Sequence, residues 1–171
     1  MREQHAKRSP ALLCAMAAPA LYVVVNLIAI QAAGPHPGIE DPYNDWMLGQ
    51  PDRELESMRM WTFSIAAILA AAAAFLGALH GWLNRRPSVA RVLPRAVAGI
   101  GYLLTLALAI AANPTTSLWE LNDDSARGSM VAEWHFPALV GVGVVTLVAV
   151  IGWLSGVIRD TSAHAEVQAS N

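Results

Sequence analysis

The stretch WTFSIAAILAAAAAFLGALHGWLN, residues 61–84, decides the fold class, because it holds no charged side chain over a length that crosses a bilayer. A helix needs about 20 apolar residues to cross roughly 30 Å of hydrocarbon. Within lipid a segment must satisfy its own backbone hydrogen bonds, which a helix does and an open sheet does not. This stretch therefore predicts a transmembrane helix that ends close to residue 83.

Three further charge-free stretches repeat this pattern. Of the 171 residues, 55% are hydrophobic and only 14% are charged, whereas a soluble domain is closer to a quarter charged. The predicted fold is all-α: a single membrane domain, residues 1–171, built as a four-transmembrane-helix bundle. We expect spans at approximately 11–33, 61–83, 96–112 and 134–158, loops at 34–60 and 113–133, and short tails at 1–10 and 159–171.

The basic residues predict on which side of the membrane each loop lies, since cytoplasmic segments carry an excess of lysine and arginine. Eight of the eleven basic residues lie before the first span, between the second and third, or after the fourth; ten of the thirteen acidic residues lie in the other two loops. Both termini are therefore expected in the cytoplasm, below a bacterial-type plasma membrane. The loops 34–60 and 113–133 are expected outside.

Features within the spans predict how the helices pack. Pro19 is expected to kink the first span, with a neighbouring helix satisfying the carbonyl that it leaves free. Asn26 and Thr105 are the most central polar side chains, and a hydrogen bond from either to another helix contributes about 1 kcal/mol. Helical spacing continues upstream through Met58, so the second helix is expected to start within the loop 34–60.

Small residues spaced four apart let two helices approach closely in lipid. The pairs Gly77/Gly81 and Gly152/Gly156 have this spacing. Packing within one bundle is the favoured interpretation, and a homodimer or another protein partner at these faces is the alternative. The lipid bilayer is the other expected partner.

Several classes of function are disfavoured. A net charge of -2 without a basic cluster gives no sign of a nucleic-acid partner. The lone Cys14 forms neither a disulfide framework nor a CxxC motif. No ionisable residue lies in the middle of a predicted span, where such residues usually mark ion or proton paths.

The densest polar and aromatic group is Glu133-Trp134-His135, which opens the fourth predicted span. Histidine beside carboxylates can bind a divalent metal or move a proton. The spacing matches neither HExxH nor an EF-hand loop. The favoured interpretation is an acidic, solvated loop with one interfacial histidine, with no metal and no cofactor. A metal site formed by His36, Asp41, Glu133 and His135 is the alternative.

The last third of the chain resembles the small four-helix membrane family that includes anthrone-oxygenase-like proteins. The likeness depends on Asn113-Pro114 at the end of the third span, Trp119 in the polar stretch that follows, and Glu133-Trp134-His135. The sequence departs from the family pattern at Phe136-Pro137, where an arginine is expected. The resemblance implies cofactor-independent oxidation of an aromatic, polyketide-like substrate in a pocket lined by Asn113, Trp134 and His135.

Two classes of function stay open. A non-catalytic accessory, binding or scaffold protein is preferred, because no catalytic constellation appears and the span centres are uncharged. The alternative is a small membrane enzyme that acts on a hydrophobic aromatic substrate at the outer boundary. Its candidate catalytic residues are His135, Glu133 and Asn113, and Trp134 and Trp119 are candidate ligand contacts.

Overall fold

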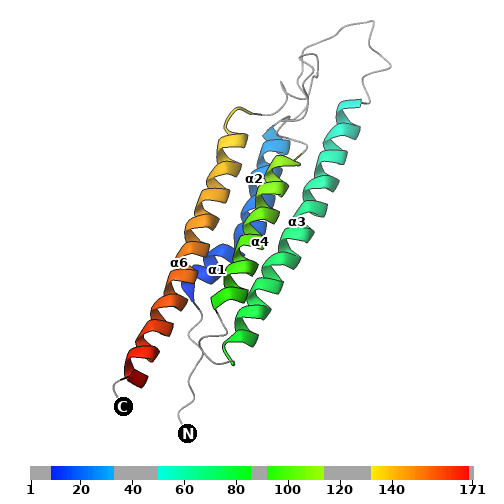
Figure 1. Cartoon of the computed structure of the whole chain (residues 1–171). Coiled ribbons are helices and arrows are strands. Elements are labelled where there is room, and N and C mark those ends of the chain that lie inside the picture. Colours follow the sequence, from blue (N-terminus) through cyan, green and yellow to red (C-terminus); the bar gives the residue numbers. More distant parts are fainter. Residues whose placement is uncertain (1–8, 33–49, 86–91, 114–131, 170–171) are drawn as a thin grey trace, which may run out of the picture.

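The computed structural model describes residues 9–32, 50–85, 92–113 and 132–169, and these ranges are helical except at a few residues at helix ends and at Ala17 (Figure 1). The helices are α1 (Pro10–Met16), α2 (Ala18–Ala32), α3 (Gln50–Leu83), α4 (Val92–Ala111) and α6 (His135–Ala169). Four segments are long and apolar enough to cross a membrane: Pro10–Ala32, Glu56–Leu83, Val92–Ala111 and His135–Gly156. The prediction of four long apolar helices is confirmed for the described residues.

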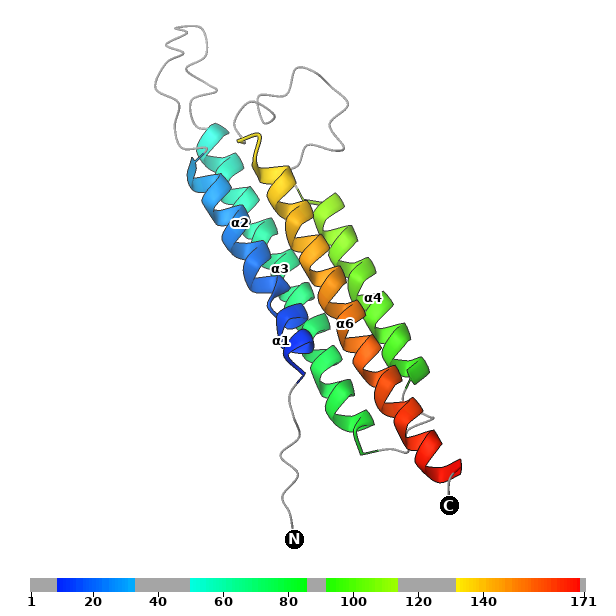
Figure 2. The same ribbon diagram turned by 90° about the vertical axis from the view of Figure 1, so that its left-hand side faces the viewer.

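These four segments, called spans below because of their length and composition, form an up-and-down bundle in which α1 and α2 together make the first span. Each span packs against the next one in sequence, and α6 closes the ring against α1 and α2. The first span and α4 therefore run parallel across one diagonal of the bundle, and α3 and α6 across the other. The start of α1 and the end of α6 lie toward the same end of the bundle (Figure 2), which we call the terminal end. The opposite end is the far end.

A regular stripe of residues on each span points into the bundle. Along α4 and α6 the stripe recurs every three or four positions, the spacing that keeps one side of a helix against its neighbours. The outward faces carry large apolar side chains instead. Leu108 is 68% exposed, and Phe75 and Val148 are each 64% exposed. The inward stripes are Arg95, Gly99, Tyr102, Leu106, Ala109 and Asn113 on and just after α4, and His135, Leu139, Val142, Thr146, Ala149 and Trp153 on α6.

The first span breaks at Ala17, between α1 and α2. Pro19 has no N–H to donate to the carbonyl of Ala15, four residues earlier. The hydroxyl of Tyr102, on α4, donates to that carbonyl at 2.8 Å. The carbonyl of Ala15 therefore accepts from a neighbouring helix, as expected, in addition to a backbone N–H at the end of α1.

A second tyrosine makes the corresponding contact at the other end of α4. The last carbonyl groups of a helix lack partners within that helix, and the N–H of Asn113 goes to Ile110 rather than to Ala109. The hydroxyl of Tyr22, on α2, donates to the Ala109 carbonyl at 3.4 Å. Both tyrosines thus donate to carbonyls at a helix break or a helix end, across the same diagonal.

The glycine pairs divide between the inside and the outside of the bundle. A Cβ added at Gly77 would lie 2.9 Å from Cε of Met16, and one at Gly152 would lie 3.7 Å from Cβ of Ala11. Added Cβ atoms at Gly81 and Gly156 would meet nothing within 4 Å. One member of each pair therefore packs against the first span, and the other faces outward.

Candidate functional site

Three buried polar side chains meet at the far end of the bundle. Asn26 on α2, Asn113 after α4 and His135 at the start of α6 are 0%, 2% and 1% exposed. Nδ2 of Asn113 donates to Oδ1 of Asn26 at 2.7 Å. Nε2 of His135 lies 3.1 Å from the same oxygen. One amide oxygen therefore joins three of the four spans.

The hydrogen bonds around Asn26 determine where the proton on His135 lies. Nδ2 of Asn26 donates to the Tyr22 carbonyl at 2.8 Å, and a carbonyl only accepts, so the orientation of the amide is fixed. Oδ1 of Asn26 can then only accept. Nε2 of His135 must carry a hydrogen and donate it, which makes this imidazole a structural donor in the arrangement observed.

Local sequence explains why these groups turn inward. Residues that precede a proline are biased away from helix, and Pro114 follows Asn113 directly. The last residue of α4 is Ala111. Asn113 is thereby released from the helix while it still continues the inward stripe. At the start of α6, the backbone N–H of His135 donates to the Ala132 carbonyl at 2.9 Å, which fixes the first turn and the direction of the side chain.

A second polar group, the terminal-end cluster, lies at the opposite end and consists of His80, Asn84, Arg95 and Trp153. Nε1 of Trp153 donates to Nδ1 of His80 at 3.2 Å. Nδ2 of Asn84 lies 3.1 Å from Nε2 of His80, and Nη2 of Arg95 donates to Oδ1 of Asn84. Arg95 is only 3% exposed, because α4 begins at Val92 and therefore includes a residue that the predicted third span, 96–112, left outside.

His80 faces more donors than a neutral imidazole can accept. An indole N–H only donates, so Nδ1 of His80 accepts from Trp153 and the ring hydrogen lies on Nε2. That hydrogen faces the amide nitrogen of Asn84, whose oxygen is already held by Arg95. The imidazole can therefore be bonded to Trp153 or to Asn84, but not to both at once.

The structure brings together some of the residues that the sequence singled out. Asn113 and His135 meet on Asn26, which the sequence flagged for helix packing and not for chemistry. Glu133 and Trp134 are exposed. The Trp134 ring lies edge-on to His135, with 6.3 Å between ring centroids. Whether these residues form an active site stays a prediction.

The other predicted candidates, His36, Asp41 and Trp119, lie outside the described residues. Within the described part of the chain, no group of three or more His, Cys, Asp or Glu side chains is placed to hold a metal ion.

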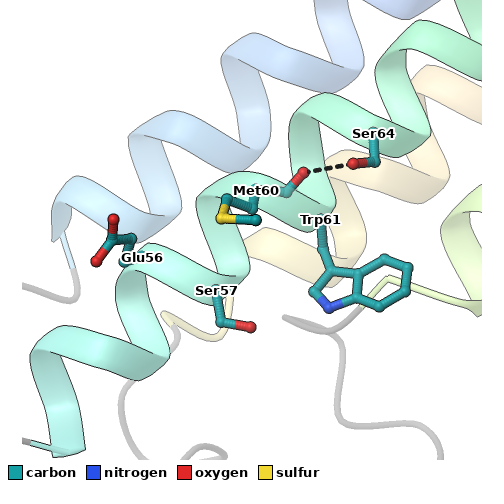
Figure 3. Close-up of a pocket in the computed structure, with 5 residues that line it drawn as sticks. All are labelled: Glu56, Ser57, Met60, Trp61 and Ser64. Carbon is teal, nitrogen blue, oxygen red and sulfur yellow. Dashed lines mark hydrogen bonds between the residues drawn. The ribbon is translucent and has the colours of Figure 1, made fainter.

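Two open cavities are lined by other residues. A shallow pocket of about 400 Å³ lies along the start of the α3 span, at Glu56, Ser57, Met60, Trp61 and Ser64 (Figure 3). Its lining residues all belong to one helix, and the Trp61 side chain is 58% exposed. A groove of about 540 Å³ separates the first span from the alanine-rich face of α3. Neither is lined by Asn26, Asn113 or His135.

No family model, no curated protein and no solved structure matches this chain.

Proposed function

We propose that this chain is a non-catalytic integral membrane protein, an accessory or scaffold subunit whose polar core residues join helices. The observation that carries this proposal is the use of Asn26: its oxygen accepts from Asn113 and from His135, and its nitrogen donates to its own helix. A substrate site is normally a concave pocket with a few convergent polar groups. Here the convergent groups are at most 2% exposed and bind one another.

The outward faces support placement in a bilayer. Large apolar side chains on all four spans are more than half exposed, among them Ile28, Ile68, Leu104 and Ile151. In water such faces favour association with other surfaces, whereas in lipid they meet a solvent of matching polarity. Exposed Trp61, Trp82 and Trp134 lie near span ends, the depth at which indole rings favour the headgroup region. The charge of the loops supports cytoplasmic termini in a bacterial-type plasma membrane.

Cysteine labelling tests the orientation. In a Cys14→Ala background, Arg85→Cys and Glu133→Cys each introduce one thiol at an exposed position at opposite ends of the bundle. A membrane-impermeant maleimide should label Glu133→Cys in intact cells and Arg85→Cys only after permeabilisation. Labelling of both in intact cells, or the reverse pattern, overturns the proposed orientation.

Photo-crosslinking tests the accessory role. A photo-reactive residue at Gly81 or Gly156, both of which face outward, should crosslink to a second protein in native membranes. Gly101 on α4 also faces open space but belongs to neither glycine pair, so the same residue there is the matched control. Crosslinks of equal yield at all three positions, or none at any, contradict a partner at these faces.

A second candidate is the small membrane enzyme that the family resemblance implies, acting on a hydrophobic aromatic substrate. The observation that favours it is the meeting of Asn113 and His135, since the resemblance points to both residues. A thermal-shift screen of purified protein against apolar aromatic compounds and divalent metals separates the two candidates, with His135→Gln beside the wild type. A ligand at a hundred times its Kd stabilises the folded state by about 2.7 kcal/mol.

A stabilisation that disappears in His135→Gln would place a ligand site at His135, which supports an enzyme or a binding protein and overturns the proposed accessory or scaffold role. No shift for any compound, together with stronger crosslinking at Gly81 or Gly156 than at Gly101, supports the accessory role.

A further inference from the structure

Hydrogen bonds across the two diagonals show which residues lie level with one another. Across the first diagonal, the pairs Ala15/Tyr102, Tyr22/Ala109 and Asn26/Asn113 are each 87 positions apart. Two parallel helices that keep one offset stay in step along their length. Asn26 and Asn113 therefore belong to one level of the bundle.

The second diagonal places a fourth residue at this level. His80 on α3 and Trp153 on α6 are bonded across 73 positions. Both helices run unbroken and parallel from this contact to the far end, so the same offset puts Thr62 level with His135. His135 in turn contacts Asn26. One polar residue from each span, Asn26, Thr62, Asn113 and His135, thus makes up a single layer, which we call the far-end polar layer.

Thr62 differs from three other hydroxyl side chains of the spans. The hydroxyls of Ser64, Thr105 and Thr146 each donate to the carbonyl four residues earlier, at 2.9, 2.8 and 2.7 Å. Thr62 is 0% exposed, yet its Oγ1 makes no such bond and has no hydrogen-bond partner among the described residues. Its neighbours on the inward stripe of α3 are the apolar Met58, Ile65 and Leu69.

A buried hydroxyl without a partner is costly, and internal water is the usual way in which proteins satisfy such a group. A water needs two to four polar partners, and the far-end polar layer offers a hydroxyl, two amides and an imidazole. These groups carry no carboxylate charge, so they suit a neutral molecule that both donates and accepts rather than a metal ion.

We propose that the far-end polar layer binds one internal water molecule, held between Oγ1 of Thr62 and the amide and imidazole groups of Asn26, Asn113 and His135. The water completes the layer by linking α3 to the three spans that are already joined at Asn26. This site is independent of the accessory role proposed above, since it depends only on the interior of the bundle.

Nuclear magnetic resonance of the full-length protein in detergent micelles tests the proposal, by means of rotating-frame transfer between water and the Thr62 methyl group or the Asn113 side-chain amide. The sign of the transfer separates a bound water from proton exchange. The wild type should show direct contacts at both groups. Thr62→Val keeps the shape and removes the hydroxyl, and it should abolish the Asn113 contact.

Thr146→Val is the matched control, because Thr146 is equally buried but bonded to its own helix; it should leave the Asn113 contact unchanged. Thr62→Ser retains a hydroxyl and should also retain the contact, which separates loss of the water from a general loss of packing. Absence of water contacts in the wild type, or an unchanged Asn113 contact in Thr62→Val, overturns the proposal. So does a contact that appears only in sodium and not in choline buffer, since the occupant is then a cation.

Discussion

The donors and acceptors around Asn26, at the far end of the bundle, match one another, whereas those around His80, at the terminal end, do not. Oδ1 of Asn26 receives two donors while its nitrogen has a carbonyl to donate to. In the terminal-end cluster His80 faces two donors, Trp153 and Asn84, and can accept from only one. Both regions join spans, but they also differ in burial, since Asn26, Asn113 and His135 are buried, whereas His80 is partly exposed and Asn84 is exposed.

The difference shows that polar groups in an apolar bundle can either specify one hydrogen-bond arrangement or allow two alternative arrangements. Where every partner is satisfied, a polar network specifies a single packing. Because the His80 imidazole can accept from only one donor, two arrangements compete. In one, Trp153 donates to His80 and joins α6 to α3; in the other, Asn84, just after α3, donates to His80. We therefore expect the far end to contribute more to stability than the terminal end.

The largest expected effect comes from breaking the matched end. Asn26→Ala leaves the donors on Asn113 and His135 without their shared acceptor, and an unsatisfied buried donor costs about 1–3 kcal/mol. We expect a loss of about 3 kcal/mol in the free energy of unfolding, measured by chemical denaturation in mixed micelles. Asn84→Ala is the comparison at the terminal end; it removes one hydrogen bond from Arg95 at an exposed amide, and we expect a smaller loss of about 1.5 kcal/mol. Equal losses at the two ends would contradict the comparison.

The two tyrosines give the next effect in size. Tyr102→Phe removes a 2.8 Å hydrogen bond to the carbonyl that Pro19 leaves free, and we expect it to cost about 1 kcal/mol. Tyr22→Phe removes a longer bond of 3.4 Å and should cost about half as much. The same denaturation experiment measures both. A larger loss for Tyr22→Phe would show that the break in the first span is stabilised mainly by apolar packing.

Removing the competition at His80 should have a smaller effect on stability but a clear spectroscopic one. Trp153→Phe deletes the indole donor, and a single hydrogen bond between helices in lipid contributes about 0.6 kcal/mol on average. Nε2 of His80 can then accept from Asn84, and the ring hydrogen should move to Nδ1. Nitrogen-15 spectra of labelled histidine should show this change of tautomer. An unchanged tautomer in Trp153→Phe would mean that Asn84 never competes for the ring.

The smallest expected effects are at the glycine pair on α3. Gly81→Ala adds a methyl group in open space, so the better helix propensity of alanine should stabilise the monomer by about 0.5 kcal/mol. Gly77→Ala should gain less, because its Cβ forces the end of the Met16 side chain to move. If Gly81→Ala destabilises the protein in membranes but stabilises it in dilute detergent, a partner contacts that position in the membrane.

The sequence predicted the helices because the length of a charge-free stretch can be read from consecutive residues. It also predicted the break in the first span, because Pro19 has no N–H to donate. It did not predict that Arg95 is buried or that Thr105 bonds to its own helix, because these depend on which way each helix is rotated. The spacing of Arg95, Gly99, Tyr102 and Leu106 contains that signal, since it continues the stripe that ends at Asn113. The meeting of Asn26 with Asn113 and His135 depends on register between distant segments, which no local pattern records.

The break at Pro19 also has a consequence for the order of biosynthesis. The Tyr102 hydroxyl that donates to Ala15 and the Asn113 amide that donates to Asn26 are each synthesised 87 residues later than their acceptors. At roughly 5–20 residues per second, the ribosome needs on the order of ten seconds to deliver these partners. In the membrane placement proposed above, the Asn26 side-chain oxygen lacks the donors on Asn113 and His135 during that interval, and lipid cannot replace them. The nascent first span should therefore stay beside the insertion machinery until the third span emerges, and enter the bilayer together with it.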